Sequence, residues 1–367
     1  MNGPWADVRR ILVMRLDNIG DVLMTSPVLR ALKENLPTSH ITLMASPGGS
    51  EAAPLLPCVD EVLPWRVLWQ DLGRLSFDPA REWGLIETLR EGGYEAALIL
   101  TSFKQTPHAA GYACYLAGIP LRLGESKEWG GGVLTTEVPP APDELHQAER
   151  NLRLIEHAGF RVKDRSLGIR VSEEARKTAT ALLEARGVPG ATPYLLLSPW
   201  TSCQARTYGA DRFASAAYRL SKETGWPVMV SGTEADRTRS GELLGALDDR
   251  GVDLVGATDL STLAALVEGA RLVLTNNTST MHLVDALRTP AVVLFSGTEL
   301  EGQWRPRDAP HRLLRRETWC SPCYAFVCPY NLECLDIPPE EVAEAGLSLL
   351  DGAGDGFAAA GREGSRP

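Results

Sequence analysis

A short polar turn between the first strand-like run and the first helix-like run carries side chains suited to acid–base chemistry. The apolar run ends at Arg15, and Asp17, Gly20 and Asp21 follow before an amphipathic segment resumes. A carboxylate there can take a proton from a bound hydroxyl, and burial can raise its pKa. Gly20 permits an unusual backbone or a close ligand approach. The alternative is that Asp21 simply caps the helix, which explains one residue of the turn but not the set.

Four crowded cysteines form a second constellation. The pattern C-x2-C-x4-C-x5-C comprises Cys320, Cys323, Cys328 and Cys334. Four thiolates in such a short span can close a tetrahedral sulfur site for zinc or iron. A site filled by four protein ligands leaves no open position for substrate, so the metal would be structural. Disulfides are the alternative, and a reducing cytoplasm disfavours them.

Length and charge limit the class of protein. The 367 residues suit two domains. A formal net charge of −10 argues against non-specific nucleic-acid binding, which needs basic surface. The N-terminus lacks an apolar signal core, and no apolar run reaches the roughly 18 residues of a membrane span. We therefore expect a cytoplasmic protein with no transmembrane segment and no nucleic-acid partner.

Apolar runs that alternate with helix-like segments predict mainly parallel sheets covered on both faces. The pattern is renewed after about residue 190, which favours two doubly wound α/β domains with ligands at the carboxyl ends of their strands. The predicted strands are Ile11–Met14, His40–Ala45, Glu61–Leu63, Ala96–Leu100, Tyr194–Ser198, Pro227–Ser231, Leu254–Val255, Leu272–Thr275 and Ala291–Phe295.

A polar helix is predicted over Glu173–Arg186, and Gly187 and Pro189 punctuate its end. The segment suits the entry to a second domain. The last residues are small, polar and glycine-rich, which is typical of disorder. We predict a first domain over 1–172, a second over 173–350 with a cysteine-rich segment at 320–334, and a disordered tail over 351–367.

The opening turn, RLDNIGDVLMTSPVLRAL, resembles the N-terminal signature of glycosyltransferase family 9, the ADP-heptose:lipopolysaccharide heptosyltransferases. Further similar pieces follow in the family's order over most of residues 10–345. They are GIPLRLGES, HQAERNLRLIEHAG, SPWTSCQARTYGADRFA, VSGTEAD and the long run from VGATDL to LFSGT.

The resemblance implies the GT-B architecture, with two Rossmann-like domains facing a cleft, the acceptor on the first and the nucleotide sugar on the second. It also implies inversion without a catalytic metal or other cofactor. The family's base matches Asp21, with Asp17 as a nearby competitor. The cysteine segment also resembles the cysteine-bound iron site of family members that modify bacterial autotransporters.

The resemblance places the leaving diphosphate near two polar loops. Arg206 stands where the family usually carries a lysine, and an arginine can bind phosphate with a bidentate fork. Thr201 and Ser202 add donors to the same turn. An exposed loop arginine is the alternative reading.

The segment Asn277–His282 replaces the family's Asp-Thr-Gly-x-x-His, and its free N–H groups can hold a phosphate. Glu234 matches a carboxylate that binds ribose hydroxyls, unless it is a solvated glutamate. A packed helix histidine is the alternative for His282. The residues implied at the nucleotide sugar are Gly20, Thr201, Ser202, Glu234, Asn277, Thr278, Ser279, Thr280 and His282.

We therefore predict an enzyme that transfers a sugar, heptose from ADP-heptose being favoured, to the hydroxyl of a lipid-linked saccharide, a protein or a small molecule. A lipopolysaccharide acceptor would bring it into peripheral contact with the inner membrane face. The alternatives are a nucleotide-sugar epimerase or hydrolase of the same build, and a non-catalytic nucleotide-binding member. The segment 63–85, rich in Trp, Phe and Arg, is predicted to form an acceptor loop unless it is a helix packed on the first domain.

Overall fold

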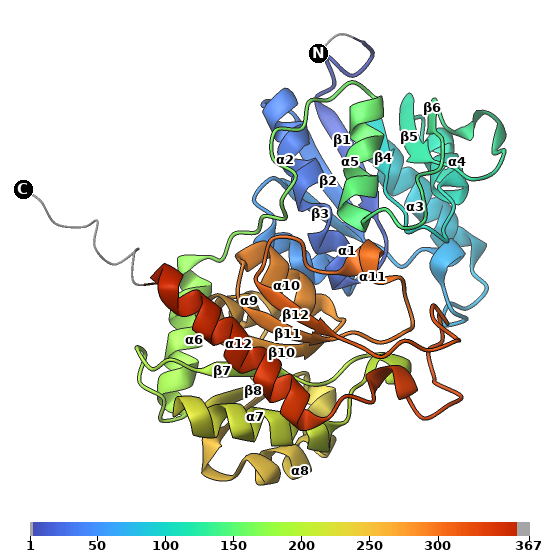
Figure 1. The fold of residues 1–367 in the computed structure, drawn as a ribbon. Coiled ribbons are helices and arrows are strands. Elements are labelled where there is room, and N and C mark those ends of the chain that lie inside the picture. The colour runs from blue at the N-terminus through green and yellow to red at the C-terminus, as the bar shows by residue number, and fades with distance from the viewer. Residues whose placement is uncertain (1–2, 358–367) are drawn as a thin grey trace, which may run out of the picture. The chain divides into compact units, whose positions relative to one another are not determined.

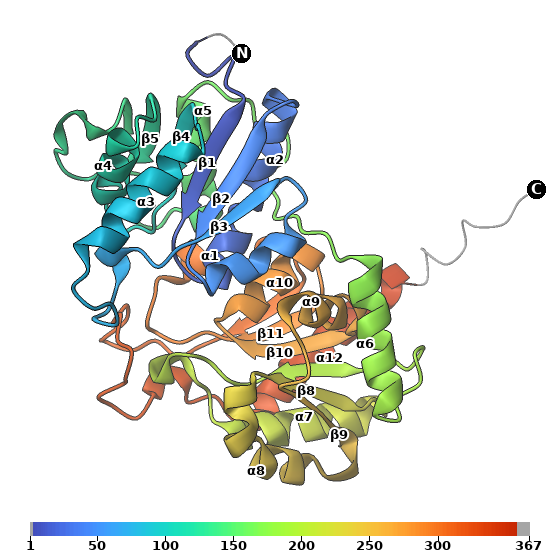
Figure 2. The same cartoon turned by 180° about the vertical axis from the view of Figure 1, so that it is seen from behind.

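The computed structural model describes residues 3–357, and the chain divides into two compact units, Met1–Arg170 and Val171–Pro367. Each unit is a parallel sheet with helices on both faces (Figure 1, Figure 2). The predicted α/β class is therefore confirmed. Among the described residues, none of the helices combines the length and apolar character that a bilayer span requires.

In the first unit, the described strands form a six-stranded parallel sheet in the order β3-β2-β1-β4-β5-β6. Leu12, Met14 and Ile99 point to one face of the sheet, where α3 and α4 cover them. Helices α2 and α5 pack against each other. The strands are β1 (Arg10–Arg15), β2 (His40–Ala45), β3 (Glu61–Pro64), β4 (Ala96–Ile99), β5 (Leu121–Glu125) and β6 (Thr136–Val138). The α-helices are α1 (Ile19–Leu23), α2 (Ser26–Asn35), α3 (Pro79–Glu91), α4 (His108–Leu116) and α5 (Gln147–His157).

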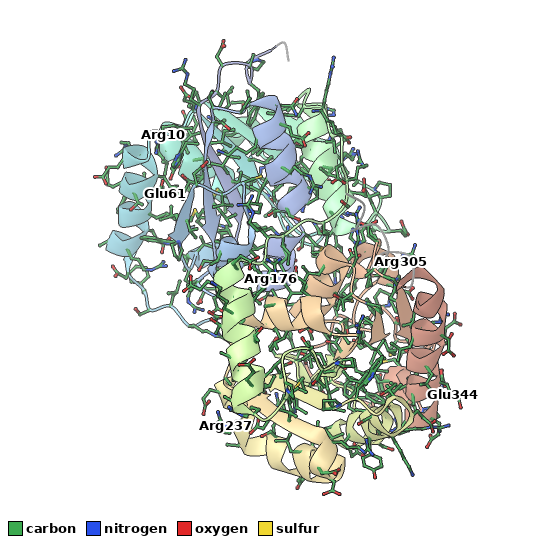
Figure 3. The ribbon with its side chains drawn as sticks, turned by 90° about the vertical axis from the view of Figure 1, so that its left-hand side faces the viewer. Arg10, Glu61, Arg176, Arg237, Arg305 and Glu344 are labelled. Atoms are coloured by element: carbon green, nitrogen blue, oxygen red, sulfur yellow. The ribbon has the colours of Figure 1, made fainter. Side chains whose placement is uncertain are left out.

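The second unit repeats this plan. Its described strands form a six-stranded parallel sheet in the order β12-β11-β10-β7-β8-β9, and α7, α8 and α12 bury one face. Helix α6 packs on α9 and is joined to it by an ion pair between Arg176, which Figure 3 labels, and Glu268. The strands are β7 (Leu195–Ser198), β8 (Val228–Gly232), β9 (Gly251–Val255), β10 (Leu272–Asn276), β11 (Ala291–Leu294) and β12 (His311–Leu314). The α-helices are α6 (Glu173–Ala185), α7 (Ala210–Thr224), α8 (Arg237–Leu247), α9 (Leu260–Gly269), α10 (Ser279–Leu287), α11 (Glu301–Trp304) and α12 (Pro339–Phe357).

Both sheets share the 3-2-1-4-5-6 order of doubly wound nucleotide-binding folds. In this order the chain leaves the first strand of each sheet in one direction and the fourth in the other. Their carboxyl ends therefore part, and ligands bind in such folds at this switch point. The switch lies between β1 and β4 in the first unit and between β7 and β10 in the second.

The end of the chain corrects one expectation. Helix α12 runs to Phe357, so residues 351–357, predicted to start a disordered tail, are helical. The earlier turns of α12 pack on α7 and nucleate the helix, and extending an existing helix costs little. The rest of the predicted tail, 358–367, lies outside the described residues.

Candidate active site

The switch point of the first sheet holds a buried arginine between two carboxylates. Arg15 ends β1 and is fully buried. Its Nη2 donates to Asp21 Oδ1 at 2.7 Å, and its Nε lies 3.1 Å from Asp17 Oδ2. The same Nη2 also reaches Ser102 Oγ, on the loop after β4, at 2.8 Å. One cation thus serves two carboxylates and joins the loops of both switch-point strands.

Neighbouring loops hold Asp17 in place. Gln105, after β4, donates its side-chain amide to Asp17 Oδ1 and accepts the backbone N–H of Ser102 at 2.9 Å. Ser46, after β2, donates to the carbonyl oxygen of Asp17 at 2.6 Å. Gly49 lies against the same carbonyl, so closely that a Cβ there would stand 2.6 Å from it. The turn is therefore fixed from both neighbouring strands.

Helix α1 positions Asp21. Asn18 is its N-cap, and Asp21, at the third helical position, accepts the backbone N–H of Asn18 at 3.2 Å. The capping role proposed as the alternative for Asp21 is therefore real, and it coexists with the bond to Arg15. Gly20 is buried in the first turn of α1 and is not among the glycines with positive φ. Of the two roles predicted for Gly20, the unusual backbone is therefore wrong, because a helical turn needs none, and the close approach of a ligand stays a prediction.

The two carboxylates differ in their surroundings. Burial raises the pKa of Asp17 above its usual range, and the nearby Asp21 raises it further. The guanidinium of Arg15 and the Gln105 amide oppose that shift in the pKa of Asp17 without cancelling it. Asp17 therefore holds its negative charge at a cost to the folded state.

In the second unit, side-chain bonds fasten the two switch-point loops to each other. Asn276, the last residue of β10, donates to the carbonyl of Pro199 at 2.7 Å and accepts the N–H of Tyr208 at 3.0 Å. Ser198, at the end of β7, shares a 3.0 Å hydrogen bond with Thr280 in the first turn of α10. Sequence reasoning missed Asn276, although a polar residue at a buried strand end was a usable signal.

Arg206 lies on the loop after β7, at the end of the 3-10 turn Gln204–Arg206. Its Nη2 pairs with Glu299 Oε1 at 2.7 Å, and its Nε is buried without a hydrogen bond. Thr201 uses its hydroxyl within the loop, toward Cys203 and Thr207, while Ser202 is exposed. Glu299 is a site neighbour that the sequence analysis missed, because it follows a different strand.

Helix α10 begins at the end of β10 with a cluster of polar side chains. Asn277 is 3% exposed, and its Oδ1 accepts the N–H of Ser296 at 3.3 Å while its Nδ2 has no partner. Thr278 is the N-cap, and Ser279 is half-buried in the first turn. His282 is buried edge-to-face against Trp304, with 6.4 Å between ring centroids. The packed-histidine alternative thus has a physical basis, whereas Asn277 offers a free buried donor.

Glu234 begins a 3-10 turn after β8 and is exposed. Arg237, which Figure 3 labels, donates to both of its carboxylate oxygens, at 2.8 and 3.0 Å, and lowers the pKa of Glu234. In this arrangement the carboxylate of Glu234 is paired with Arg237, the first residue of α8. Asp259 caps α9 by accepting the N–H of Thr262 at 2.7 Å.

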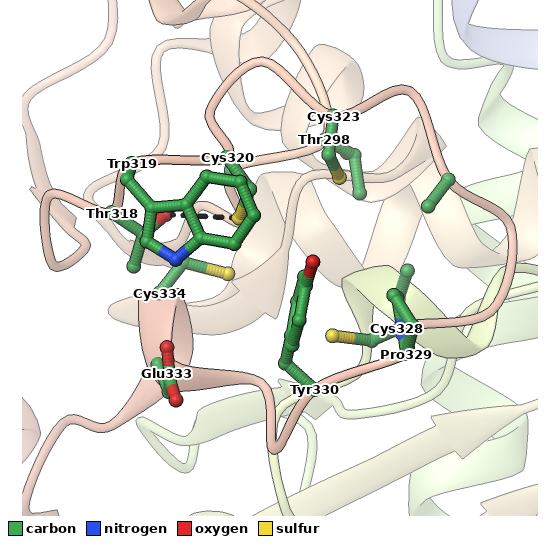
Figure 4. Close-up of a pocket in the computed structure, with 13 residues that line it drawn as sticks. Thr298, Thr318, Trp319, Cys320, Cys323, Cys328, Pro329, Tyr330, Glu333 and Cys334 are labelled. Carbon is green, nitrogen blue, oxygen red and sulfur yellow. Dashed lines mark hydrogen bonds between the residues drawn. The ribbon is translucent and has the colours of Figure 1, made fainter.

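The four clustered cysteines line one cavity of about 330 Å³ (Figure 4). Their loop surrounds the ring of Tyr330, and the Cys320 thiol approaches Thr318 Oγ1 at 3.5 Å. Burial raises the pKa of the Cys334 thiol, a bond with the backbone of Gly297 opposes the rise, and the three other cysteines add to it. All are free thiols.

This cavity does not have the geometry of a finished metal centre. No three cysteine, histidine or acidic side chains in the described part of the chain are gathered closely enough to share an ion. Zinc–sulfur bonds of about 2.3 Å would require the thiols to move together. The donor chemistry therefore suits zinc or iron, while the spacing of the sulfurs does not.

The cysteine loop is built onto the loops around Arg206. Ala205 donates its N–H to Phe326 at 3.0 Å, and the side chain of Gln204 accepts the N–H of Cys328 at 2.8 Å. On the other side, the N–H of Cys323 bonds to the carbonyl of Gly297 at 3.0 Å, two residues before Glu299. The cysteine loop thus braces both members of the Arg206–Glu299 pair.

The switch point of the first sheet thus presents carboxylates, and that of the second presents an arginine and a helix N-terminus. The model of glycosyltransferase family 9 (heptosyltransferase) matches residues 83–332, more than half of the chain. The chain belongs to glycosyltransferase family 9. This confirms the resemblance drawn from the opening turn, and the protein is accordingly a glycosyltransferase.

Curated and solved members of the family resemble this glycosyltransferase over nearly its whole length. Lipopolysaccharide heptosyltransferase 2 of Escherichia coli K12 is 26% identical over 360 residues, which cover 93% of this chain and 98% of the relative. The structure of a family 9 glycosyl transferase from Veillonella parvula superposes with a TM-score of 0.77 at 21% identity, covering 95% and 98% of the two chains. The E. coli ADP-heptose lipopolysaccharide heptosyltransferase II gives 0.74 at 22% identity, covering 94% and 99%.

The raised pKa of Asp17 predicts how this glycosyltransferase's stability depends on pH. An aspartate whose pKa is higher in the folded state opposes folding when ionised, and the penalty vanishes below its unfolded pKa. We expect Asp17→Asn to increase the free energy of unfolding at pH 8, and this gain to shrink as the pH falls toward about 4. Urea denaturation from pH 4 to 8 measures it.

The matched control is Asp143→Asn, at an exposed pair with Lys127 that lowers the pKa of Asp143. This control should bring no gain in stability at pH 8. An Asp17→Asn variant that is less stable than the wild type at pH 8 would contradict the account of Asp17.

Proposed function

We propose that this family 9 member is an inverting, metal-independent heptosyltransferase, which moves heptose from ADP-heptose to an acceptor hydroxyl with Asp21 as general base. The observation that carries the proposal is the Asp21 carboxylate, held by Arg15 at the switch point of the first sheet. Full-length similarity to lipopolysaccharide heptosyltransferase 2 supports the choice of sugar.

Proton removal is the task proposed for the first unit. Arg15 occupies Oδ1 of Asp21, while Oδ2 accepts only a longer bond from the Asn18 amide. Oδ2 therefore has a lone pair for the acceptor's proton. As that O–H bond breaks, the oxygen attacks the anomeric carbon from the face opposite the diphosphate, and the leaving group departs with the electrons of its C–O bond.

Binding the nucleotide diphosphate is the task proposed for the second unit. Arg206 supplies a cation, the N-terminus of α10 supplies N–H groups and a positive dipole end, and Asn277 Nδ2 supplies a buried donor. Such preorganised groups can neutralise the leaving group's charge in place of a metal. The phosphate would take the guanidinium of Arg206 from Glu299.

The remaining predicted donor contacts stay within this proposal. Thr278, Ser279 and Thr280 belong to the turn that begins α10, beside the proposed phosphate position. Glu234 could bind the ribose only if it released Arg237. Thr201 organises the Arg206 loop through its local bonds, so its contribution to the nucleotide would be indirect.

A lipid-linked saccharide is the proposed acceptor, by analogy with the lipopolysaccharide heptosyltransferases. The segment between β3 and α3 is the proposed acceptor loop. It exposes large apolar side chains that no neighbouring element covers, and these would rest on the lipid part of the acceptor at the membrane face. They are Leu68, Leu72, Phe77 and, in the first turns of α3, Trp83.

A structural zinc or iron ion at the cysteine loop is a separate part of the proposal. Four thiols around one cavity carry it, and the ion would draw their sulfurs together. Because the loop braces Arg206 and Glu299 from outside, the ion would hold the loop and take no part in the reaction.

Replacing the proposed base tests the function. Asp21→Asn should reduce ADP release from ADP-heptose, in the presence of lipopolysaccharide truncated before its heptoses, by at least about 100-fold, because general-base catalysis contributes about 10²–10⁴-fold. Affinity for ADP should stay within a few-fold, since Asp21 belongs to the other unit. The wild-type rate in this variant would remove Asp21 as the base.

Removing the arginine side chain that is proposed to bind the diphosphate should weaken binding of the nucleotide sugar. Arg206→Ala should raise the Kd for ADP about 10-fold or more, the loss of one charge-assisted contact, whereas Arg206→Lys should retain most of the affinity. Arg219→Ala, at an exposed pair on α7, is the matched control. Calorimetric titration measures all three, and an unchanged Kd in Arg206→Ala would exclude the arginine from the phosphate site.

Metal analysis tests the cysteine loop. Protein purified without chelator should contain about one equivalent of zinc or iron, which the double variant Cys320→Ser/Cys323→Ser loses and the control Cys58→Ser keeps. Wild-type protein free of both metals would end the metal proposal and leave the proposed transferase reaction untouched.

A further inference from the structure

The cluster of Arg15, Asp17 and Asp21 has a composition that a lone general base does not require. A base needs one carboxylate within reach of a hydroxyl. Here a second carboxylate, Asp17, is held against the same guanidinium and has a side chain only 12% exposed, close to the 13% of Asp21. Burying a second negative charge is costly, so its presence calls for a reason.

We propose that the three residues act as a unit that accepts one proton, with Asp17 as the positioning residue whose negative charge makes Asp21 a competent base. This inference rests on the proposed function, because it concerns the same proton transfer. Asp17 does not touch the acceptor in this scheme. It acts through Arg15.

The charges of the cluster carry the argument. With both carboxylates ionised, Arg15 leaves a net charge of −1 in a buried site. When Asp21 takes the acceptor's proton, the charge becomes zero, and Asp17 keeps the guanidinium paired. Without the charge of Asp17, the Arg15–Asp21 pair is already neutral, and an added proton would leave an unpaired buried cation. Proton transfer is favoured in the first case and opposed in the second.

The side chains that bond to the cluster from neighbouring loops are uncharged, so its charge balance depends on Arg15, Asp17 and Asp21. From the loop after β4, Ser102 and Gln105 bond to the cluster, and neither ionises. Lys104 in that loop lies over the Phe103 ring. From the loop after β2, Ser46 contacts only the backbone of Asp17. Burial raises the pKa of Asp17, Arg15 opposes the rise and Asp21 adds to it, so the charges of Arg15 and Asp21 both act on Asp17.

Gln105 and Ser102 explain why Asp17 stays oriented toward Arg15. Gln105 bonds to Asp17 Oδ1 and is itself held by the N–H of Ser102, which leaves Oδ2 facing the guanidinium at 3.1 Å. The loop of the neighbouring strand thus fixes the second charge beside Arg15.

The test is a pH–rate profile of Asp17→Asn from pH 5 to 9, with ADP release from ADP-heptose and truncated lipopolysaccharide as the readout. We expect kcat to fall about 10- to 100-fold, part of what a general base contributes, with the KM for the donor within about 3-fold. We also expect the acid limb of the profile to move to lower pH. Asp143→Asn should retain the wild-type profile.

The outcomes separate this inference from the proposed function. Wild-type kcat in Asp17→Asn, or a lowered kcat with an unmoved acid limb, would overturn the role of Asp17, since a merely structural residue does not shift the limb. Asp21→Asn run beside it keeps the two claims apart. If Asp21→Asn is inactive and Asp17→Asn is normal, only the inference fails. If Asp21→Asn is active, or the wild type releases no ADP, the proposed function itself fails.

Discussion

The reversal of strand order in each sheet is the constraint on which the candidate site of each unit depends. Parallel strands send their carboxyl ends to one edge, and between β1 and β4, and again between β7 and β10, the following segments diverge to opposite faces. Side-chain hydrogen bonds join the diverging loops at each switch point. Arg15 with Ser102 joins them at the first, and Asn276 with Pro199 and Tyr208 joins them at the second. The polar groups that fasten the fold there are also the groups that can meet a ligand.

At both switch points, the groups proposed to act in the reaction include buried charged or unpaired polar groups that lower the free energy of unfolding. Arg15 is fully buried with two carboxylates, and Asn277 keeps a buried amide nitrogen without a partner. A chain selected only for stability would avoid both, because buried charges and unsatisfied donors lower the free energy of unfolding. Arg206 is different, since its charge is paired with Glu299. The first unit holds a buried net negative charge, and the second holds buried donors, as the proposed transfer of a proton and release of a diphosphate would require.

Much of the fold was predictable because central parallel strands are uninterrupted apolar runs. All nine predicted strands occur, with ends displaced by a few residues at most. Three others were missed: LRLGE in β5 carries a charge at either side of its glycine, β6 has three residues, and β12 is a partly exposed edge strand. Charge pairs were harder to predict. The closeness of Asp17 and Asp21 could be expected from the turn, but their sharing of Arg15 and the pairing of Arg206 with Glu299 depend on loops distant in sequence.

The central claim is that the second unit binds an adenosine diphosphate sugar for transfer. Calorimetric titration of the intact protein with ADP, UDP and GDP, followed by the matching sugar nucleotides, tests it most directly. The account predicts selective binding of ADP and ADP-heptose. Binding of UDP or GDP instead would contradict the heptose donor, and binding of none of them would contradict a catalytic role for this member of the family.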